Sequence, residues 1–295
     1  MKETVFTGCC VAAVTPMRSD GSVDLKKYAD FIDMLIQKGA DAIAVNSTTG
    51  ESATLSDEEQ YNIICCIKDV INRRVPLIAG AGSNNTHHAA RLALNARNAG
   101  ADALLCVTPY YNKTNENGLI EHFTFVAEHA NLPIILYNVP SRTGMSITPE
   151  VYRKLSANPL ICAVKESSGS IADIAHTRAL CGDELDIYAG NDDYIVPVMS
   201  LGGKGVVSVL GNLLPERVHE ICVLCQKGDF SAAAKLQIEV MPLIDALFSD
   251  INPIPVKEAL TLTGFDAGPL RLPLYHLSEE RREVLRGVLQ RFALI

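Results

Sequence analysis

The sequence predicts a (β/α)8 TIM barrel with a small C-terminal helical extension, and three observations favour this α/β fold. Short apolar runs alternate with longer amphipathic segments along the chain. Eight such runs occur, and their starts recur at intervals of roughly thirty residues or a little less, the length of one strand, loop and helix. No complete dinucleotide-binding glycine fingerprint follows any of them, so a closed barrel is favoured over an open, doubly wound sheet.

The predicted strands are short runs bounded by turn residues, as expected for buried strands. They cover residues 10–14, 42–46, 77–80, 103–108, 134–137, 161–165, 187–190 and 206–209. The segments between them carry apolar residues three and four positions apart, which predicts amphipathic helices. The first such stripe is Leu25, Tyr28, Ile32, Leu35 and Ile36. Two near copies, 39–43 and 100–104, each place a glycine where a helix is expected to end.

Beyond Gly211 the strand pattern disappears and only helical segments follow. The predicted helices cover residues 215–225, 230–248, 255–262 and 278–292. Since the last barrel unit needs only one of them, we divide the chain into a catalytic barrel, residues 1–225, and a helical extension, residues 226–295. No Gly/Ser-rich linker separates the two, so the extension is expected to pack against the barrel.

Composition narrows the class of protein. Of the 295 residues, 48% are hydrophobic and 20% are charged, which allows a large core. The formal net charge of −8 argues against a nucleic-acid partner. No run of transmembrane length and no secretory signal are found, so a cytoplasmic protein without a membrane partner is expected. Cys222 and Cys225 form a lone pair without a second pair or a histidine at zinc spacing, so no metal site is predicted.

Lys165 is the central candidate for catalysis. It ends the sixth predicted strand, and the reactive residues of an α/β barrel lie at the carboxyl ends of the strands and in the loops that follow. Burial there removes hydration from an ammonium and favours the neutral amine, which can attack a carbonyl carbon. The alternative is a structural lysine paired with Glu166, although alternation along a strand would direct Glu166 away from the barrel interior.

Other strand ends carry polar groups that suit Schiff-base chemistry. Tyr137, on the adjacent strand, is a candidate for the proton transfer that removes a carbinolamine hydroxyl. Thr48 and Thr49 precede a glycine and offer hydroxyls and backbone N–H groups to a carboxylate. Arg142 can hold a second carboxylate through two parallel hydrogen bonds. No strand end offers a Ser-His-Asp set or a cluster suited to a metal.

Each of these residues also has a structural interpretation that the pattern leaves open. Tyr137 can be a core tyrosine, and Arg142 can be a solvated arginine. Thr48 and Thr49 can cap the helix that follows, with Glu51 completing a capping box.

Six stretches together resemble one known family. They are TTGESATL (48–55), TPYYNK (108–113), LYNVPSRTG (136–144), VKE (164–166), GNDD (190–193) and NPIPVK (252–257). In this order and over nearly the whole chain, the sequence is similar to the dihydrodipicolinate synthase group of the pyruvate-dependent class I aldolase family, which also includes N-acetylneuraminate lyase. The resemblance implies condensation of pyruvate with aspartate semialdehyde, on the diaminopimelate route to lysine, by a homotetrameric barrel, a dimer of dimers.

The resemblance also implies roles for individual residues. Lys165 would form an imine with pyruvate, so that no separate cofactor is needed. Tyr137, Thr48 and Tyr111 would form a proton relay, with Tyr111 supplied by a neighbouring subunit. Further implied contacts are Thr49 with the pyruvate carboxylate, Arg142 with the carboxylate of the semialdehyde, and Gly190 and Val207 with backbone groups around pyruvate.

The chain departs from the family pattern in two places. Ser47 stands where the synthases usually carry glycine, while Arg142 and the double threonine favour the synthase over the lyase. The positions implied for regulation by lysine are Ser52, Ala53, Asn84 and Tyr110. Three further positions hold Asp57, Gln60 and His88, where lysine-sensitive members carry two histidines and a glutamate. Weak or absent inhibition by lysine is therefore expected.

Two other functions remain open at this level. The chain can be another aldolase of the same family, cleaving a sugar acid or a hydroxy-oxo acid, or a barrel that binds pyruvate without catalysis.

Overall fold

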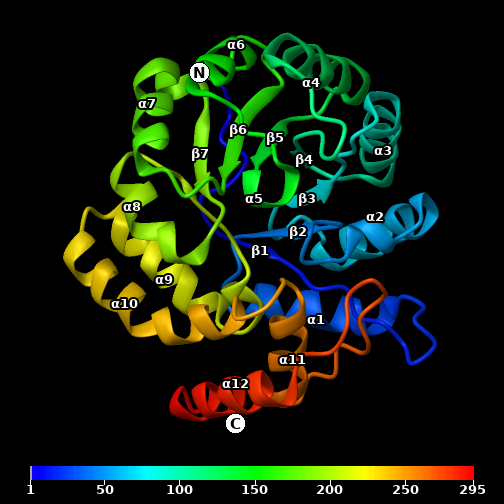
Figure 1. Cartoon of the computed structure of the whole chain (residues 1–295), viewed down its shortest axis with the longest axis vertical. Helices are drawn as coiled ribbons and strands as arrows, with labels where there is room; N and C mark the ends of the chain where they lie inside the picture. Colours follow the sequence, from blue (N-terminus) through cyan, green and yellow to red (C-terminus); the bar gives the residue numbers. More distant parts are fainter. Residues whose placement is uncertain (1) are drawn as a thin grey trace.

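The eight predicted strands form one closed parallel barrel. The computed structural model describes residues 2–295, and its strands follow chain order around the barrel, with β8 pairing back to β1 (Figure 1). The strands are β1 (Gly8–Ala12), β2 (Ala42–Val45), β3 (Leu77–Gly80), β4 (Ala103–Val107), β5 (Ile134–Asn138), β6 (Ile161–Glu166), β7 (Asp186–Ala189) and β8 (Gly205–Ser208). The predicted fold class is confirmed.

Strand bounds agree with the prediction to within one residue, except in β1. That strand lies two residues earlier than predicted, over Gly8–Ala12. The Val14 N–H donates to the side chain of Asn212 at 3.1 Å, so this part of the chain leaves the strand ladder. A buried N–H must find a partner, and here a side chain provides it.

The helices surround the barrel and continue beyond it (Figure 1). They are α1 (Leu25–Gln37), α2 (Asp57–Ile71), α3 (Thr86–Ala99), α4 (Glu116–Ala130), α5 (Pro140–Thr143), α6 (Pro149–Leu155), α7 (Ile171–Cys181), α8 (Ile195–Ser200), α9 (Pro215–Gln226), α10 (Phe230–Leu247), α11 (Ile254–Leu262) and α12 (Glu279–Arg291). In α1 the predicted stripe is confirmed, because Tyr28, Ile32 and Leu35 are buried. Gly100 ends α3 at φ +93°, a conformation that glycine adopts without strain. None of the helices within residues 2–295 is long and apolar enough to cross a membrane.

Two separate apolar layers stabilise the barrel. One lies inside it, built from side chains of alternate strand positions such as Cys10, Ile135 and Val207, and Phe6 stacks on Tyr188 there with ring centroids 4.0 Å apart. The other lies between the strands and the surrounding helices. Since residues alternate between these layers, neighbours on one strand face different environments.

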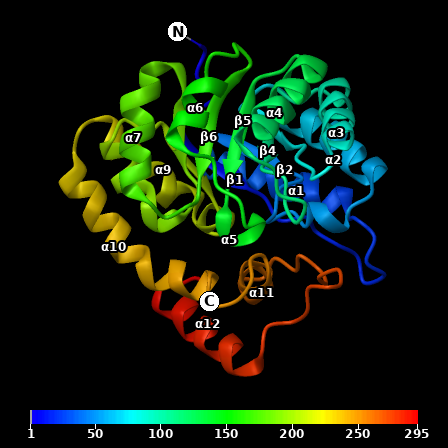
Figure 2. The same cartoon turned by 45° about the horizontal axis from the view of Figure 1, so that its top comes forward.

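The C-terminal helices pack against the barrel. Helix α10 contacts α8 and α9, α12 packs on α10 and α11, and Figure 2 places α11 near the side of the barrel where β5 leads into α5. The four helices predicted after Gly211 are confirmed to within one residue at each end. The proposed division after residue 225 stays a prediction.

A buried ion pair anchors α11 to the loop after β2. Lys257 Nζ lies 2.8 Å from Glu51 Oε1, with the two side chains 3% and 0% exposed. The same ammonium donates to the carbonyl of Pro269 at 2.8 Å, and the second oxygen of Glu51 accepts the Arg271 N–H at 2.9 Å. Burial lowers the pKa of Lys257, and the Glu51 carboxylate opposes that shift. The loop that carries Thr49 is thus held by the C-terminal part of the chain.

These contacts correct one structural interpretation. Glu51 does not complete a capping box with the threonines, because its carboxylate is bonded to Lys257 and Arg271. The capping box of α2 is formed instead by Ser56 and Glu59, whose side chains each bond the other residue's backbone N–H.

Breaking the buried pair should destabilise the protein. We expect Lys257→Met to lower the free energy of unfolding by about 3–5 kcal/mol, because the Glu51 carboxylate would stay buried without its partner. Urea denaturation followed by circular dichroism measures this. Adding Glu51→Gln should recover part of the loss, and Lys227→Met, at an exposed lysine, should change the free energy by less than about 0.5 kcal/mol. Equal losses in the single and double variants would contradict the explanation.

His122 predicts a pH dependence of stability. It is buried on α4, its Nδ1 lies 2.9 Å from the Thr86 hydroxyl, and burial lowers its pKa to about 4. Unfolding exposes an imidazole that titrates near pH 6.5, so the unfolded state binds the proton first. The stability that neutral His122 contributes is complete above pH 6.5 and is lost as the pH falls through 4.

Between pH 7 and pH 4, the wild type should therefore lose about 2–3 kcal/mol more unfolding free energy than His122→Gln, which does not titrate. Denaturation midpoints at a series of pH values measure the difference. Parallel pH profiles for the two proteins would contradict it.

Candidate active site

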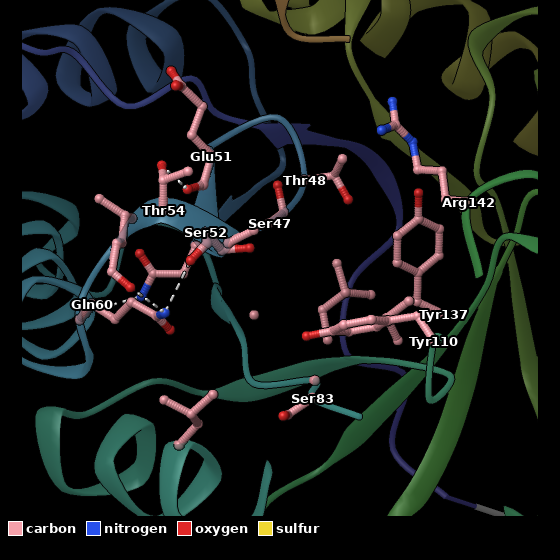
Figure 3. Close-up of a pocket in the computed structure, with 18 of the residues that line it drawn as sticks. Ser47, Thr48, Glu51, Ser52, Thr54, Gln60, Ser83, Tyr110, Tyr137 and Arg142 are labelled. Carbon is pink, nitrogen blue, oxygen red and sulfur yellow. Dashed lines mark hydrogen bonds between the residues drawn. The ribbon is translucent and has the colours of Figure 1, made fainter. Parts of the chain in front are cut away.

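A cavity of about 430 Å³ lies where the loops after the strands meet the C-terminal segment. Six predicted site residues line it: Thr48, Ser52, Ala53, Tyr110, Tyr137 and Arg142. Figure 3 shows Tyr110, Tyr137 and Arg142 on one side, across the cavity from Ser52 and Gln60. This position agrees with the expectation that the chemistry of a barrel lies at the carboxyl ends of its strands.

Lys165 and Tyr137 lie together inside the barrel. They are register partners on β6 and β5, and Lys165 Nζ lies 4.4 Å from the centroid of the Tyr137 ring. Lys165 is only 4% exposed and is not among the residues that line the cavity, whereas Tyr137 lines it. The predicted proximity of the two residues is confirmed, while their roles remain predictions.

Glu166 is directed away from Lys165 and out of the barrel. Its carboxylate accepts hydrogen bonds from the Tyr152 hydroxyl at 2.8 Å, from the Ser168 N–H at 2.8 Å and from the Asn138 amide. Tyr152 belongs to the outer apolar layer. Within residues 2–295 no ion pair joins Lys165 to a carboxylate, so the interpretation of a Lys165–Glu166 pair is wrong.

The two threonines have different surroundings. Thr48 lines the cavity, whereas Thr49 is 2% exposed and is bonded to the C-terminal segment. The Asn252 amide donates to the Thr49 hydroxyl at 3.0 Å. Gly50 is fixed as well, because its carbonyl accepts from the Thr15 hydroxyl at 2.7 Å. The loop after β2, which carries the two threonine hydroxyls, is therefore held by Thr15 as well as by Asn252.

Arg142 contacts the same asparagine. It lies on α5 with an exposed side chain, and its Nη2 donates to the backbone carbonyl of Asn252 at 3.1 Å. Sequence reasoning included Asn252 only as the first residue of a matching stretch and gave it no role. Its contacts join residues far apart in the chain, so no local pattern could have identified them.

Tyr111 is not brought to the other predicted relay residues within one chain. It is 93% exposed and adopts φ +69°, while its neighbour Tyr110 is 38% exposed and lines the cavity. The backbone carbonyl of Asn84 accepts a hydrogen bond from the Asn112 side-chain amide at 2.9 Å. Asn84 thereby supports the loop that carries both tyrosines.

Gly190 and Val207 lie at different depths. Val207 is buried in the inner apolar layer beside Cys10 of β1, and Gly190 follows β7, where its N–H donates to the Glu166 carbonyl at 2.8 Å. A Cβ at Gly190 would collide with Ser167, so only glycine fits there.

The three departures from the lysine-sensitive pattern share one wall of the cavity. Asp57, Gln60 and His88 all line it. His88 Nε2 lies 2.9 Å from an Asp57 oxygen, and this hydrogen bond together with Arg91 lowers the pKa of Asp57. The imidazole is thereby engaged by a carboxylate of its own chain.

Cys222 and Cys225 are buried free thiols on α9. Burial raises the pKa of both, that of Cys225 to about 11, which keeps them protonated. No group of three His, Cys, Asp or Glu side chains within residues 2–295 has the geometry to hold a metal ion.

Comparison with known proteins agrees with this fold. A model of the dihydrodipicolinate synthetase family matches residues 5–292. A 4-hydroxy-tetrahydrodipicolinate synthase from Thermoanaerobacter sp. (strain X514) is 47% identical over 292 residues, covering 99% of this chain and 98% of that protein. One from Lachnoclostridium phytofermentans is 48% identical over 292 residues, covering 99% of both chains.

Solved structures agree as well. The dihydrodipicolinate synthase of Aquifex aeolicus has a TM-score of 0.96 at 39% identity, covering 98% of this chain and 99% of that one. The chloride-inhibited enzyme of Acinetobacter baumannii, complexed with pyruvate, has a TM-score of 0.96 at 39% identity, covering 99% and 100%. The chain belongs to the dihydrodipicolinate synthetase family.

Proposed function

We propose that this protein is a lyase that condenses pyruvate with L-aspartate semialdehyde to give 4-hydroxy-tetrahydrodipicolinate, the first committed step of lysine and diaminopimelate biosynthesis, and that it acts in the cytoplasm. One observation carries the proposal: Lys165 is buried at the end of β6 without a carboxylate partner in residues 2–295, 4.4 Å from the Tyr137 ring. A buried amine that no ion pair engages is available for nucleophilic attack, and the family membership supplies the reaction.

The first half of the reaction forms a covalent imine. Lys165 Nζ attacks the keto carbon of pyruvate, and the keto oxygen becomes the hydroxyl of a carbinolamine. Tyr137 donates a proton to that hydroxyl, which leaves as water, and the nitrogen lone pair forms the iminium. Transfer of a methyl proton to the Tyr137 phenolate then gives the enamine and restores the tyrosine hydroxyl. The imine with Lys165 takes the place of a separate cofactor.

The second half joins the two substrates. The enamine carbon attacks the aldehyde carbon, and the aldehyde oxygen takes a proton through a relay of Tyr137, Thr48 and Tyr111. The amine of the second substrate then attacks the imine carbon and displaces Lys165, which closes the ring and restores the free lysine. No oxidant or reductant is required.

Four residues position the substrates in this proposal. Thr49 binds the carboxylate of pyruvate, and Arg142, exposed beside the cavity, binds the carboxylate of the semialdehyde. Gly190 and Val207 place backbone groups around the pyruvate. Support for the loop position comes from the bond between Thr49 and Asn252.

Borohydride trapping tests the nucleophile. With pyruvate and sodium borohydride, the wild type should gain the mass of one reduced adduct on the peptide that contains Lys165. Lys165→Met should lose the adduct and lower kcat at least about 1,000-fold, because no other amine occupies this position. Lys204→Met is a control at another lysine near the barrel and should keep the adduct and the wild-type kcat. An unchanged adduct in Lys165→Met would overturn the proposal.

We further infer that the enzyme is a homotetramer, a dimer of dimers, in which Tyr111 completes the relay of a neighbouring subunit. In support, the Tyr111 side chain is 93% exposed in the single chain and does not line its own cavity. A two-fold axis would let each subunit supply the tyrosine that its partner needs.

Mixing inactive variants tests this exchange. Co-expressed Tyr111→Phe and Lys165→Met chains should recover roughly a quarter of wild-type activity, because half of randomly formed dimers are mixed and one of their two sites is complete. Chains with Tyr137→Phe mixed with chains with Lys165→Met should recover no activity. Tyr137 and Lys165 belong to the active site of the same chain, so no mixed dimer contains a complete site. Full activity in a particle with the mass of a monomer would contradict the arrangement.

The regulatory expectation stays a prediction. Asp57 and His88 are bonded to each other on the cavity wall, which is consistent with weak or absent inhibition by lysine.

A further inference from the structure

We propose that Asn252 is a positioning residue for pyruvate, acting by holding the Thr49 hydroxyl as a hydrogen-bond donor toward the substrate carboxylate. This inference rests on the proposed function, in which Thr49 binds that carboxylate. Asn252 comes from the C-terminal segment, immediately before α11, and is 7% exposed on the cavity wall.

Asn252 is bonded to both of the side chains assigned to substrate carboxylates. Its amide nitrogen donates to Thr49 Oγ1 at 3.0 Å, across 203 residues of sequence. Its backbone carbonyl accepts from Arg142 Nη2 at 3.1 Å, across 110 residues. The side chain of Asn252 therefore bonds Thr49, and its main chain bonds Arg142.

The direction of the bond to Thr49 decides what the hydroxyl can do. A threonine hydroxyl has one proton and two acceptor positions. Because the Asn252 N–H occupies an acceptor position, the single proton stays free to bond an anion. A hydroxyl that donated its proton to the protein would instead present only lone pairs, which repel a carboxylate.

The rest of the Asn252 side chain has no other protein partner. Its Oδ1 is buried and makes no hydrogen bond within residues 2–295. Thr49 is thus the one protein group that this side chain bonds in the described part of the chain, so changing the side chain should act on pyruvate through Thr49. The contact to Arg142 should survive, since it uses the backbone.

Two substitutions separate these effects. Asn252→Asp keeps the shape of the side chain but offers only acceptors. The Thr49 hydroxyl would then donate its proton to the new carboxylate and could no longer donate it to pyruvate. Asn252→Ala removes the donor without adding charge. We expect the pyruvate KM to rise at least tenfold in Asn252→Asp and about three- to tenfold in Asn252→Ala, with kcat within threefold of wild type for Asn252→Ala. The KM for the semialdehyde should stay within threefold in Asn252→Ala.

The decisive measurement is a double-mutant cycle with Thr49→Val. In that background Asn252→Ala should raise the pyruvate KM by less than twofold further, because the hydroxyl that it serves is gone. The pyruvate concentration that gives half-maximal borohydride trapping should follow the same pattern, independently of the second substrate. Asn98→Asp, which adds the same charge at an exposed residue of α3, should leave the pyruvate KM unchanged.

The outcomes distinguish the two proposals. If Thr49→Val alone leaves the pyruvate KM unchanged, the proposed role of Thr49 fails, and this inference fails with it. If Thr49→Val raises the KM but Asn252→Ala has its full effect in that background, only the inference is overturned. An unchanged pyruvate KM in Asn252→Asp overturns the inference as well.

Discussion

Alternation along β6 is the constraint on which the site depends. Successive strand residues face opposite sides of the barrel wall, so Lys165 is inside and Glu166 is outside although they are adjacent in sequence. The carboxylate that could have neutralised the lysine is instead bonded to Tyr152 and Asn138. An amine is thereby kept buried in an interior that is mostly apolar, next to a tyrosine.

The site is completed by a segment that the barrel does not need for closure. The eight strands close without residues beyond Ser208. The C-terminal segment then reaches back to the loop after β2, through Asn252 to Thr49 and through Lys257 to Glu51. The barrel supplies the amine proposed to form the imine, and this segment fixes the groups proposed to bind the substrates. Such a division lets one scaffold keep its nucleophile while the surrounding contacts vary.

The parts that could be predicted from sequence are those with a local signal. Strands and helices repeat with their own periods, so the bounds of the strands and of the four helices after Gly211 were predicted to within one residue. The exception is β1, where the side chain of Asn212 accepts from the backbone N–H of Val14. The inward Lys165 follows from the same periodicity. The contacts of Asn252 and the Glu51–Lys257 pair have no local signal, because they join positions more than a hundred residues apart.

The bonds of Glu51 also set a time at which the loop after β2 can reach its final form during synthesis. Its last partner, Arg271, follows 220 residues later in the chain. At about 5–20 residues per second, the ribosome needs on the order of 10–40 s to make that stretch. During this interval the Glu51 carboxylate lacks the partners it has in the folded protein. A nascent barrel therefore completes the loop proposed to bind pyruvate only when translation is nearly finished.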